Sequence, residues 1–221
     1  MNKKFGIIIP TYDNLEMLKR LIGQIYDFTL IDFKLIIIED GQREDTLIYL
    51  RELVKEKPNI VVIVHPQNKG VAPSWNDGIR EAEKYNVEYF AFFNDDIEIY
   101  KNWWEEVQQK FEQGYNLVST CKPCYGHKIM AGWFFVFDKE TLKRVGYFDE
   151  QLSPFYQEDT DFIWRFIRTN LKSVLLDNPQ LKHYTSTTVE KNIRVNQPEF
   201  YQRTIEKVNK YLTEKWRGLE R

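Results

Sequence analysis

Short apolar runs alternate with segments of helical periodicity over the first half of this 221-residue chain. Four runs are almost continuously apolar, as is typical of strands buried on both faces, and they span residues 5–9, 35–38, 60–64 and 89–93. In the intervals between them, apolar residues recur every three or four positions, which predicts three amphipathic helices. This alternation predicts an α/β fold with a mostly parallel central sheet, right-handed crossovers and flanking helices.

Two of the predicted helices carry polar residues that are typical of helix starts. Asp13 is followed by Glu16, and Ser74 is followed by Asp77. Each pair offers side-chain acceptors to the unpaired N–H groups of a first helical turn. We therefore expect one helix to begin near Asp13 and another near Ser74.

The second half is less regular. Further apolar runs at residues 133–137 and 173–176 predict more strands, and residues 199–217 predict a charged amphipathic helix. We expect that helix to pack on the same domain, so that residues 1–195 form the domain and residues 196–221 its C-terminal helix. Glutamate and lysine alternate there without a basic excess, which disfavours the alternative of a membrane-surface or partner-binding helix.

Charge and hydropathy narrow the class of protein. With 31 basic and 33 acidic residues, the formal charge of −2 gives no reason to expect nucleic acid as a partner. No window approaches the roughly 18 apolar residues of a membrane span, and the run that Pro10 stops is too short for a secretion signal. We expect a soluble, cytoplasmic protein of one domain.

The two cysteines form the motif Cys121-Lys-Pro-Cys124, whose spacing suits a redox pair or half of a zinc site. A closed zinc site needs about four ligands, the chain has no second cysteine pair, and only His127 lies nearby. We therefore expect two ordinary reduced thiols beside a proline turn.

Candidate ligand-binding residues follow the first two apolar runs. In a parallel α/β sheet, ligands bind beyond the carboxyl ends of the strands. Pro10, Thr11 and Tyr12 follow the first run, and Asp40 follows the second. The Tyr12 ring could stack on a base while Asp40 accepts its N–H, although an ordinary turn role fits Asp40 taken alone equally well.

Polar residues also follow the third run. Gly70 permits close backbone approach and Lys69 supplies a cation, so the Asn68-Lys69-Gly70 segment is suited to face a phosphate ahead of a helix. The segment is not a Walker loop, and the GxGxxG pattern is absent from the chain.

After the fourth run and Asn94 come Asp95 and Asp96, two adjacent carboxylates that repel each other unless a cation or donors compensate. Mg²⁺ or Mn²⁺ would compensate them and could share its ligands with substrate phosphates. A solvated turn that caps the next helix is the alternative interpretation.

Two later motifs add candidates. Glu158, Asp159 and Asp161 exceed what one helix cap requires, so a spare carboxylate could act as a general base, whereas Asp161 is assigned to capping and salt bridging. His183 is either a structural hydrogen-bonding residue or a contact to metal or phosphate.

Taken in order, these pieces resemble the family 2 glycosyltransferases of GT-A fold, particularly the rhamnosyltransferase-like branch. The resemblance covers roughly residues 5–190, and its motifs are Ile7-Ile-Ile-Pro-Thr-Tyr12, Ile38-Glu-Asp-Gly41, Asn68-Lys-Gly-Val-Ala72, Asn76-Asp-Gly-Ile79, Phe93-Asn-Asp-Asp96, Gly132-Trp-Phe-Phe-Val136, Val145-Gly-Tyr-Phe-Asp-Glu150, Glu158-Asp-Thr-Asp-Phe162 and His183.

The resemblance implies a role for each matching residue. It implies a UDP- or dTDP-sugar donor, a glycan or glycoconjugate acceptor, Mn²⁺ or Mg²⁺, and a single in-line displacement with inversion. Asp159 would be the catalytic base and Glu158 would orient the acceptor, while Asp96 and then His183 are the expected metal ligands. The donor-binding residues would be Pro10, Thr11, Tyr12, Asp40, Asn68, Lys69, Gly70, Asn76 and Asp95. Sugars pack their apolar faces on rings, which makes Trp133 the acceptor candidate.

The chain departs from the family pattern at the metal motif, which reads Asn94-Asp95-Asp96 rather than Asp-x-Asp. The chain also ends soon after the core, which argues for a small enzyme rather than a processive polysaccharide synthase. Two alternatives stay open: a catalytically degenerate domain that binds a nucleotide-sugar or glycan, and a sugar nucleotidyltransferase. The second would carry a Gly-rich, basic loop where this chain has Pro10-Thr11-Tyr12.

Overall fold

The computed structural model describes residues 4–120, 130–176, 181–184, 189 and 193–218. Its centre is a seven-stranded sheet with the strand order β3-β2-β1-β4-β7-β6-β8. These strands are β1 (Phe5–Thr11), β2 (Phe33–Asp40), β3 (Ile60–His65), β4 (Tyr89–Phe93), β6 (Leu117–Ser119), β7 (Phe134–Asp138) and β8 (Ser173–Leu175). A separate two-stranded sheet joins β5 (Ile97–Ile99) to β9 (Leu181–His183).

The first four strands run parallel to one another. Strand β1 pairs with β2 on one side and β4 on the other, and β2 pairs with β3, all in parallel. Strand β7 is antiparallel to β4 and β6. The predicted α/β fold with a mostly parallel sheet is confirmed, and the carboxyl ends of β1 to β4 meet at one edge.

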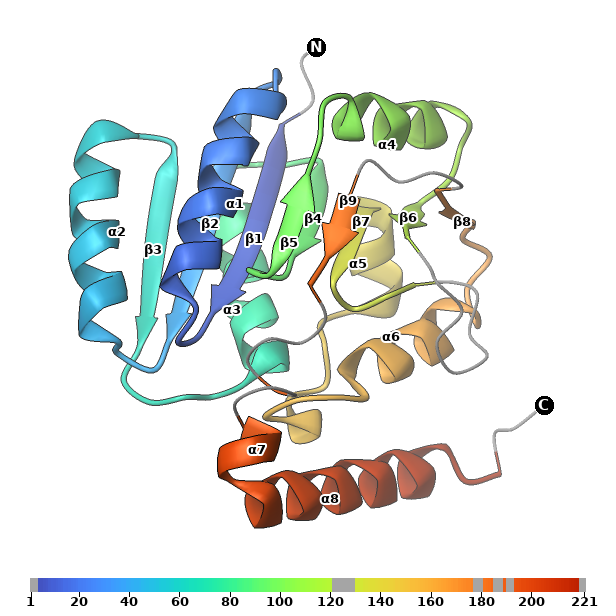
Figure 1. The fold of residues 1–221 in the computed structure, drawn as a ribbon. Coiled ribbons are helices and arrows are strands. Elements are labelled where there is room, and N and C mark those ends of the chain that lie inside the picture. Colours follow the sequence, from blue (N-terminus) through green and yellow to red (C-terminus); the bar gives the residue numbers. More distant parts are fainter. Residues whose placement is uncertain (1–3, 121–129, 177–180, 185–188, 190–192, 219–221) are drawn as a thin grey trace.

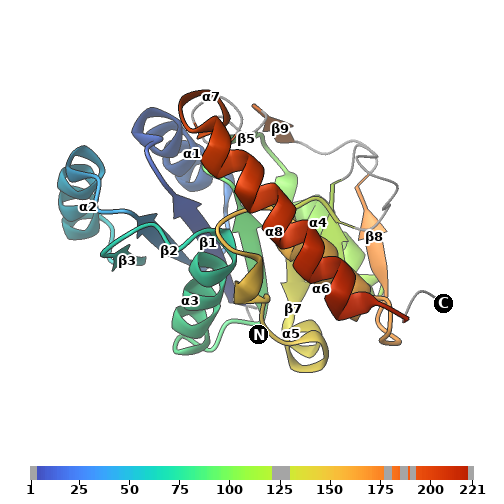
Figure 2. The same cartoon turned by 90° about the horizontal axis from the view of Figure 1, so that it is seen from below.

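Helices cover both faces of the sheet (Figure 1), and Figure 2 shows α1 on one side with α3 and α5 on the other. The helices and the short 3-10 turn are α1 (Leu15–Phe28), α2 (Glu44–Glu56), α3 (Val71–Glu83), α4 (Trp103–Glu112), α5 (Lys139–Val145), η1 (Glu150–Leu152), α6 (Glu158–Phe166), α7 (Arg194–Asn196) and α8 (Pro198–Trp216).

Two apolar layers form the core because successive strand residues point to opposite faces. Ile7 and Ile9 belong to the layer that α1 and α4 cover, whereas Ile8 belongs to the layer that α3, α5 and α6 cover. The strands are apolar on both faces for this reason, as their continuous runs predicted. The doubly covered sheet fixes the strand ends from which the site is built.

Both helix starts differ from the sequence expectation. Helix α3 begins at Val71, three residues before Ser74, and the Ser74 hydroxyl donates to the carbonyl of Gly70 at 2.7 Å. The residue at the N-cap of α1 is Asn14, which makes no capping hydrogen bond with its side chain. Asn14 instead donates to Asp95, and Ser74 donates back to the N-cap residue of its own helix.

Helix α8 runs across α6 on one face of the molecule (Figure 2). Its buried residues recur every four positions, and Val208, Leu212 and Trp216 pack with Leu152 in a small apolar cluster. The indole N–H of Trp216 donates to Asp161 at 2.9 Å. In the described ranges, no helix combines the length and apolarity needed to span a bilayer.

Candidate functional site

A cavity of about 670 Å³ opens at the carboxyl ends of the parallel strands. Of the site residues predicted from the sequence, all but Asn76 line it: Pro10, Thr11, Tyr12, Asp40, Asn68, Lys69, Gly70, Asp95, Asp96, Trp133, Glu158, Asp159 and His183. The edge of the sheet therefore brings together residues that are separated by as many as 173 positions in the chain, from Pro10 to His183.

Asn76 lies outside the cavity, contrary to the sequence expectation. It is buried on α3, where its side-chain amide donates to the carbonyl of Phe148 at 2.9 Å and to Glu150 at 2.8 Å. Its own oxygen accepts the N–H of Phe148 at 2.9 Å. Asn76 therefore fixes the segment around Phe148 and is not placed to contact a ligand.

Asp95 joins the ends of β1 and β4. The Thr11 hydroxyl donates to one carboxylate oxygen at 2.7 Å, and the Asn14 amide donates to the other at 2.8 Å. Burial raises the pKa of Asp95 to about 7, against the lowering effect of these hydrogen bonds. Two oriented donors hold this carboxylate at the floor of the cavity, an arrangement suited to a ribose or sugar hydroxyl.

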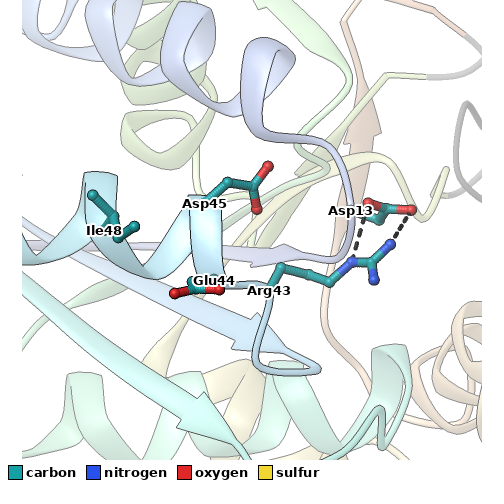
Figure 3. Close-up of a pocket in the computed structure, with 5 residues that line it drawn as sticks. All are labelled: Asp13, Arg43, Glu44, Asp45 and Ile48. Carbon is teal, nitrogen blue, oxygen red and sulfur yellow. Dashed lines mark hydrogen bonds and ion pairs between the residues drawn. The ribbon is translucent and has the colours of Figure 1, made fainter.

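Tyr12 lies between the main cavity and a smaller neighbouring one. A carbon added at Gly41 would come within 2.6 Å of the Tyr12 ring, so the ring packs directly on the backbone there. The Arg43 guanidinium lies 5.5 Å from the ring centre and is held by Asp13 through contacts of 2.5 and 3.1 Å (Figure 3). Asp13, Arg43, Glu44, Asp45 and Ile48 line the smaller cavity, of about 480 Å³.

Asp40 anchors the loop that follows β3. One of its oxygens accepts the backbone N–H of Lys69 at 2.8 Å, and the other accepts the N–H of Gly70 at 2.8 Å. The first oxygen also lies 2.7 Å from Nδ1 of His65. Asp40 is therefore engaged within the protein while it lines the cavity, which differs from the free base-binding carboxylate that its position suggested.

Gly70 brings this loop against the segment that precedes α6. Its φ of +95° lies in the region that favours glycine, and a carbon added there would come within 2.4 Å of the Pro154 backbone. The adjacent Val71 N–H donates to the carbonyl of Pro154 at 2.9 Å. The two loops therefore touch backbone to backbone.

The pairing of β5 with β9 brings Asp96 and His183 together. Ile97 stands opposite His183 in this pairing, and the Tyr184 N–H donates to the carbonyl of Asp96 at 3.0 Å. As a result, Nε2 of His183 lies 3.2 Å from Oδ1 of Asp96. The Trp133 ring is parallel to the imidazole of His183, with the ring centres 5.0 Å apart.

Asp159 and Glu158 begin α6, directly after Tyr156 and Gln157, whose φ values of 73° and 71° are uncommon for residues other than glycine. An oxygen of Asp159 accepts the N–H of Thr160 at 2.7 Å, and the backbone N–H of Gly132 also hydrogen-bonds to this carboxylate. Burial nevertheless raises the pKa of Asp159 above its usual range.

Glu158 has a different environment from its neighbour. Burial, followed by the charge of Asp159, raises the pKa of Glu158 to about 8, and within the described chain its Oε2 has no hydrogen-bond partner. A pKa of about 8 favours the uncharged form of Glu158 at neutral pH, whereas backbone donors hold the neighbouring Asp159 carboxyl group. Adjacent carboxyl groups in different environments are candidates for acid and base roles.

A comparison with known proteins identifies the family of this chain. The sequence model of the family described as "Glycosyl transferase family 2" matches residues 6–166. The chain belongs to glycosyl transferase family 2.

Among relatives of this family 2 chain, an uncharacterized glycosyltransferase of Rickettsia bellii is 31% identical over 117 residues. A GalNAc(5)-diNAcBac-PP-undecaprenol beta-1,3-glucosyltransferase of Campylobacter jejuni is 26% identical over 113 residues. The matches cover 52% and 51% of this chain but only 16% and 36% of the relatives, so the family 2 chain spans well under half their length.

Solved structures share the fold. Staphylococcus aureus TarS in complex with UDP aligns at a TM-score of 0.65 and 16% identity, over 96% of this chain and 72% of that one. GalNAc-T7 with UDP, GalNAc and Mn²⁺ aligns at 0.68 and 12% identity, over 82% and 43% of the two chains. The GT-A fold predicted from the sequence is confirmed for this family 2 chain.

The structure of the family 2 chain adds residues that sequence reasoning missed. Three residues contact predicted site residues: His65 contacts Asp40, Arg43 contacts Tyr12, and Gly132 contacts Asp159. His65 ends β3, Arg43 follows β2, and Gly132 precedes β7. Position near a strand end was the available signal, and the partner of each side chain needed the structure. Cys121, Cys124 and His127 lie outside the described residues.

Proposed function

We propose that this family 2 chain is an inverting, metal-dependent enzyme that transfers a hexosyl or deoxyhexosyl group from a UDP- or dTDP-sugar to an acceptor hydroxyl. The observation that carries the proposal is that one cavity at the strand ends holds both the Asp95-Asp96 pair and the Glu158-Asp159 pair. Charge stabilisation for a leaving diphosphate and proton transfer from an acceptor are then available within one site.

The charge of the cavity supports metal dependence. Its described lining contains five carboxyl groups and only Lys69 as a lysine or arginine; the carboxyl groups are Asp40, Asp95, Asp96, Glu158 and Asp159. A diphosphate carries negative charge, and those of the carboxyl groups that are ionised would repel it in the absence of a cation. The donor therefore requires a partner of positive charge in addition to Lys69.

Asp96 and His183 are the residues that would hold a divalent cation, since a carboxylate oxygen and an imidazole nitrogen face each other at 3.2 Å. In the described part of the chain, no three or more His, Cys, Asp or Glu residues form a metal-binding group. Diphosphate oxygens and water would complete the ligands, as they commonly do for Mg²⁺. When bound, the cation supplies charge stabilisation to the departing diphosphate.

Asp159 is the proposed general base. Its carboxylate takes the proton of the acceptor hydroxyl as that oxygen bonds to the anomeric carbon and the bond from that carbon to the diphosphate breaks. A pKa raised by burial makes Asp159 a stronger base than an exposed aspartate. The neutral acid Glu158 would donate a hydrogen bond to the acceptor and orient it.

Aromatic side chains in the lining of the cavity support a sugar acceptor. Trp133, Phe155, Tyr156 and Phe200 line the cavity, and Phe200 is 46% exposed. Rings of this kind pack against the apolar faces of sugars while hydroxyls remain available to polar groups. We propose Trp133 as the residue closest to the reacting acceptor sugar, because it also contacts His183.

The test combines binding with turnover. A nucleotide that binds the native state raises its melting temperature, so UDP, dTDP, GDP and CDP are compared with and without Mn²⁺. The proposal predicts a Mn²⁺-dependent shift with UDP or dTDP, followed by transfer from the matching sugar nucleotide with an inverted anomeric configuration in the product. A shift without any transfer or donor hydrolysis would favour a binding domain without catalysis, and a GDP-specific shift would correct the donor.

A further inference from the structure

His65 is buried at the end of β3, beside the donor side of the cavity but not in its lining. It is 2% exposed, and the pairing of β2 with β3 places it directly opposite Asp40. Its Nδ1 lies 2.7 Å from an oxygen of Asp40, which is itself only 4% exposed. A buried polar contact of this length between two strand ends is firmly oriented.

The second nitrogen of His65 also faces a carboxylate. Nε2 lies 3.0 Å from Asp77 on α3, and Arg80 donates to the other Asp77 oxygen at 2.7 Å. Although burial alone would raise the pKa of Asp77, hydrogen bonds from His65 and Arg80 bring it below its usual value. An ionised carboxylate only accepts hydrogen bonds, so the Nδ1 that faces Asp40 is placed to donate to it.

Asp40 uses its remaining acceptor positions to hold the loop that follows β3. Asp40 accepts the N–H groups of Lys69 and Gly70, which line the cavity and precede α3. Without an oriented donor from His65, the Asp40 carboxylate would be free to turn toward other donors or water. The backbone of the loop would then lose its anchor.

We propose that His65 is a positioning residue for the nucleotide: its Nδ1–H holds Asp40, and Asp40 holds the loop of residues 68–70 in its ligand-binding position. The inference rests on the proposed function, since it assumes that the loop contacts a nucleotide diphosphate. His65 touches neither the reacting atoms nor the cavity, so its effect is expected on donor binding and not on the chemical step.

Two substitutions separate this role from general support of the core. The side-chain nitrogen of asparagine stands as many bonds from Cα as Nδ1 of histidine, and that of glutamine as many as Nε2. His65→Asn therefore keeps a donor toward Asp40 and loses the one toward Asp77, whereas His65→Gln does the reverse. Both variants remove the ring, so they are matched in lost packing.

The experiment measures the affinity of wild type and both variants for whichever of UDP, dTDP, GDP and CDP, with Mn²⁺, gives the wild type the largest thermal shift. We expect His65→Asn to bind within about threefold of wild type and His65→Gln at least about tenfold more weakly, because a hydrogen bond to a charged group is lost. The Michaelis constant for the donor should rise in His65→Gln with little change in kcat.

Equal affinities in the two variants, or affinities that follow only their melting temperatures, would overturn the positioning role. If the wild type binds a nucleotide normally, that outcome contradicts the role of His65 and leaves the proposed function standing. A wild-type protein that binds none of the four nucleotides contradicts the proposed function as well, so the two failures are distinguishable.

Discussion

Gly132 leaves no room for a side chain beside Asp159: a carbon added at Gly132 would lie 3.0 Å from Oδ2 of that carboxylate. The Gly132 N–H also hydrogen-bonds to the same carboxylate. The position of the proposed base is therefore set by the backbone next to Trp133, which contacts this carboxylate at the start of α6. A base displaced by a fraction of an ångström loses much of its effect, because proton transfer depends on geometry.

Gly132→Ala should reduce kcat by about tenfold or more and leave nucleotide affinity near wild type, since the added methyl group displaces Asp159 and not the donor loop. Steady-state kinetics and calorimetric titration of the nucleotide measure the two effects. Gly23→Ala on α1 is the control, because an added carbon meets nothing within 4 Å there. Wild-type turnover in Gly132→Ala would show that the base lies elsewhere.

Asp159→Asn should lower kcat by roughly a hundredfold or more with donor affinity preserved, because it removes a proton acceptor and keeps the shape of the side chain. Asp161→Asn is a matched control on the same helix. Asp161 pairs with Arg165 at 2.9 Å and with Lys215 at 2.7 Å, so this change should lower the melting temperature and spare turnover of the folded enzyme. A near-normal rate in Asp159→Asn would reassign the base.

Asp96→Ala should abolish the Mn²⁺-dependent part of nucleotide binding, because the remaining His183 offers a single nitrogen ligand. Titration of the nucleotide with and without Mn²⁺ measures that part directly. Glu98→Ala is the control, since Glu98 lies on β5 two residues after Asp96, pairs with Arg20 and contacts Tyr100. Unchanged Mn²⁺ dependence in Asp96→Ala would remove Asp96 from the metal site.

Relative to wild type, the Glu158→Gln variant should become more stable as pH rises, because glutamine cannot ionise. The pKa of Glu158 is about 8 in the folded protein, above its ordinary value of 4.5. Between these values the unfolded glutamate is charged and the folded one is neutral, so wild-type stability falls from pH 4.5 to about 8 through this group. One pKa unit corresponds to about 1.4 kcal/mol, so a few kcal/mol are at stake.

The measurement is the melting temperature of wild type and Glu158→Gln in metal-free buffer from pH 5 to above pH 8. The difference in favour of Glu158→Gln should grow with pH over this window. A constant difference would mean that Glu158 ionises in the folded protein as it does in water.

The strand ends that carry the site were predictable, because continuous apolar runs locate buried strands and the polar residues after them locate the edge. Asp95 and Asp96 follow β4 immediately, and the sheet places them beside Thr11. The contact between Asp96 and His183 needed the structure, because β5 and β9 are short and pair across more than 80 residues. Local periodicity carries no information about a partner that distant.

Two further results depended on packing and not on pattern. Asn76 belongs to a family motif, yet its place on α3 directs its amide to the backbone of Phe148. Asp40 was expected to be available to a base, but the facing strand end supplies His65 as a partner. A sequence motif indicates that a residue has a role, and only the fold shows which neighbouring residue it contacts.

The backbone contact between Gly70 and Pro154 has a consequence for engineering this enzyme. Because the donor loop and the segment before α6 meet without an intervening side chain, they form one continuous wall. A graft that changes the length or direction of residues 68–70 would push on Pro154 and, through it, on the start of α6 that carries Asp159. Donor preference is therefore best redesigned by exchanging the two loops together as a single cassette.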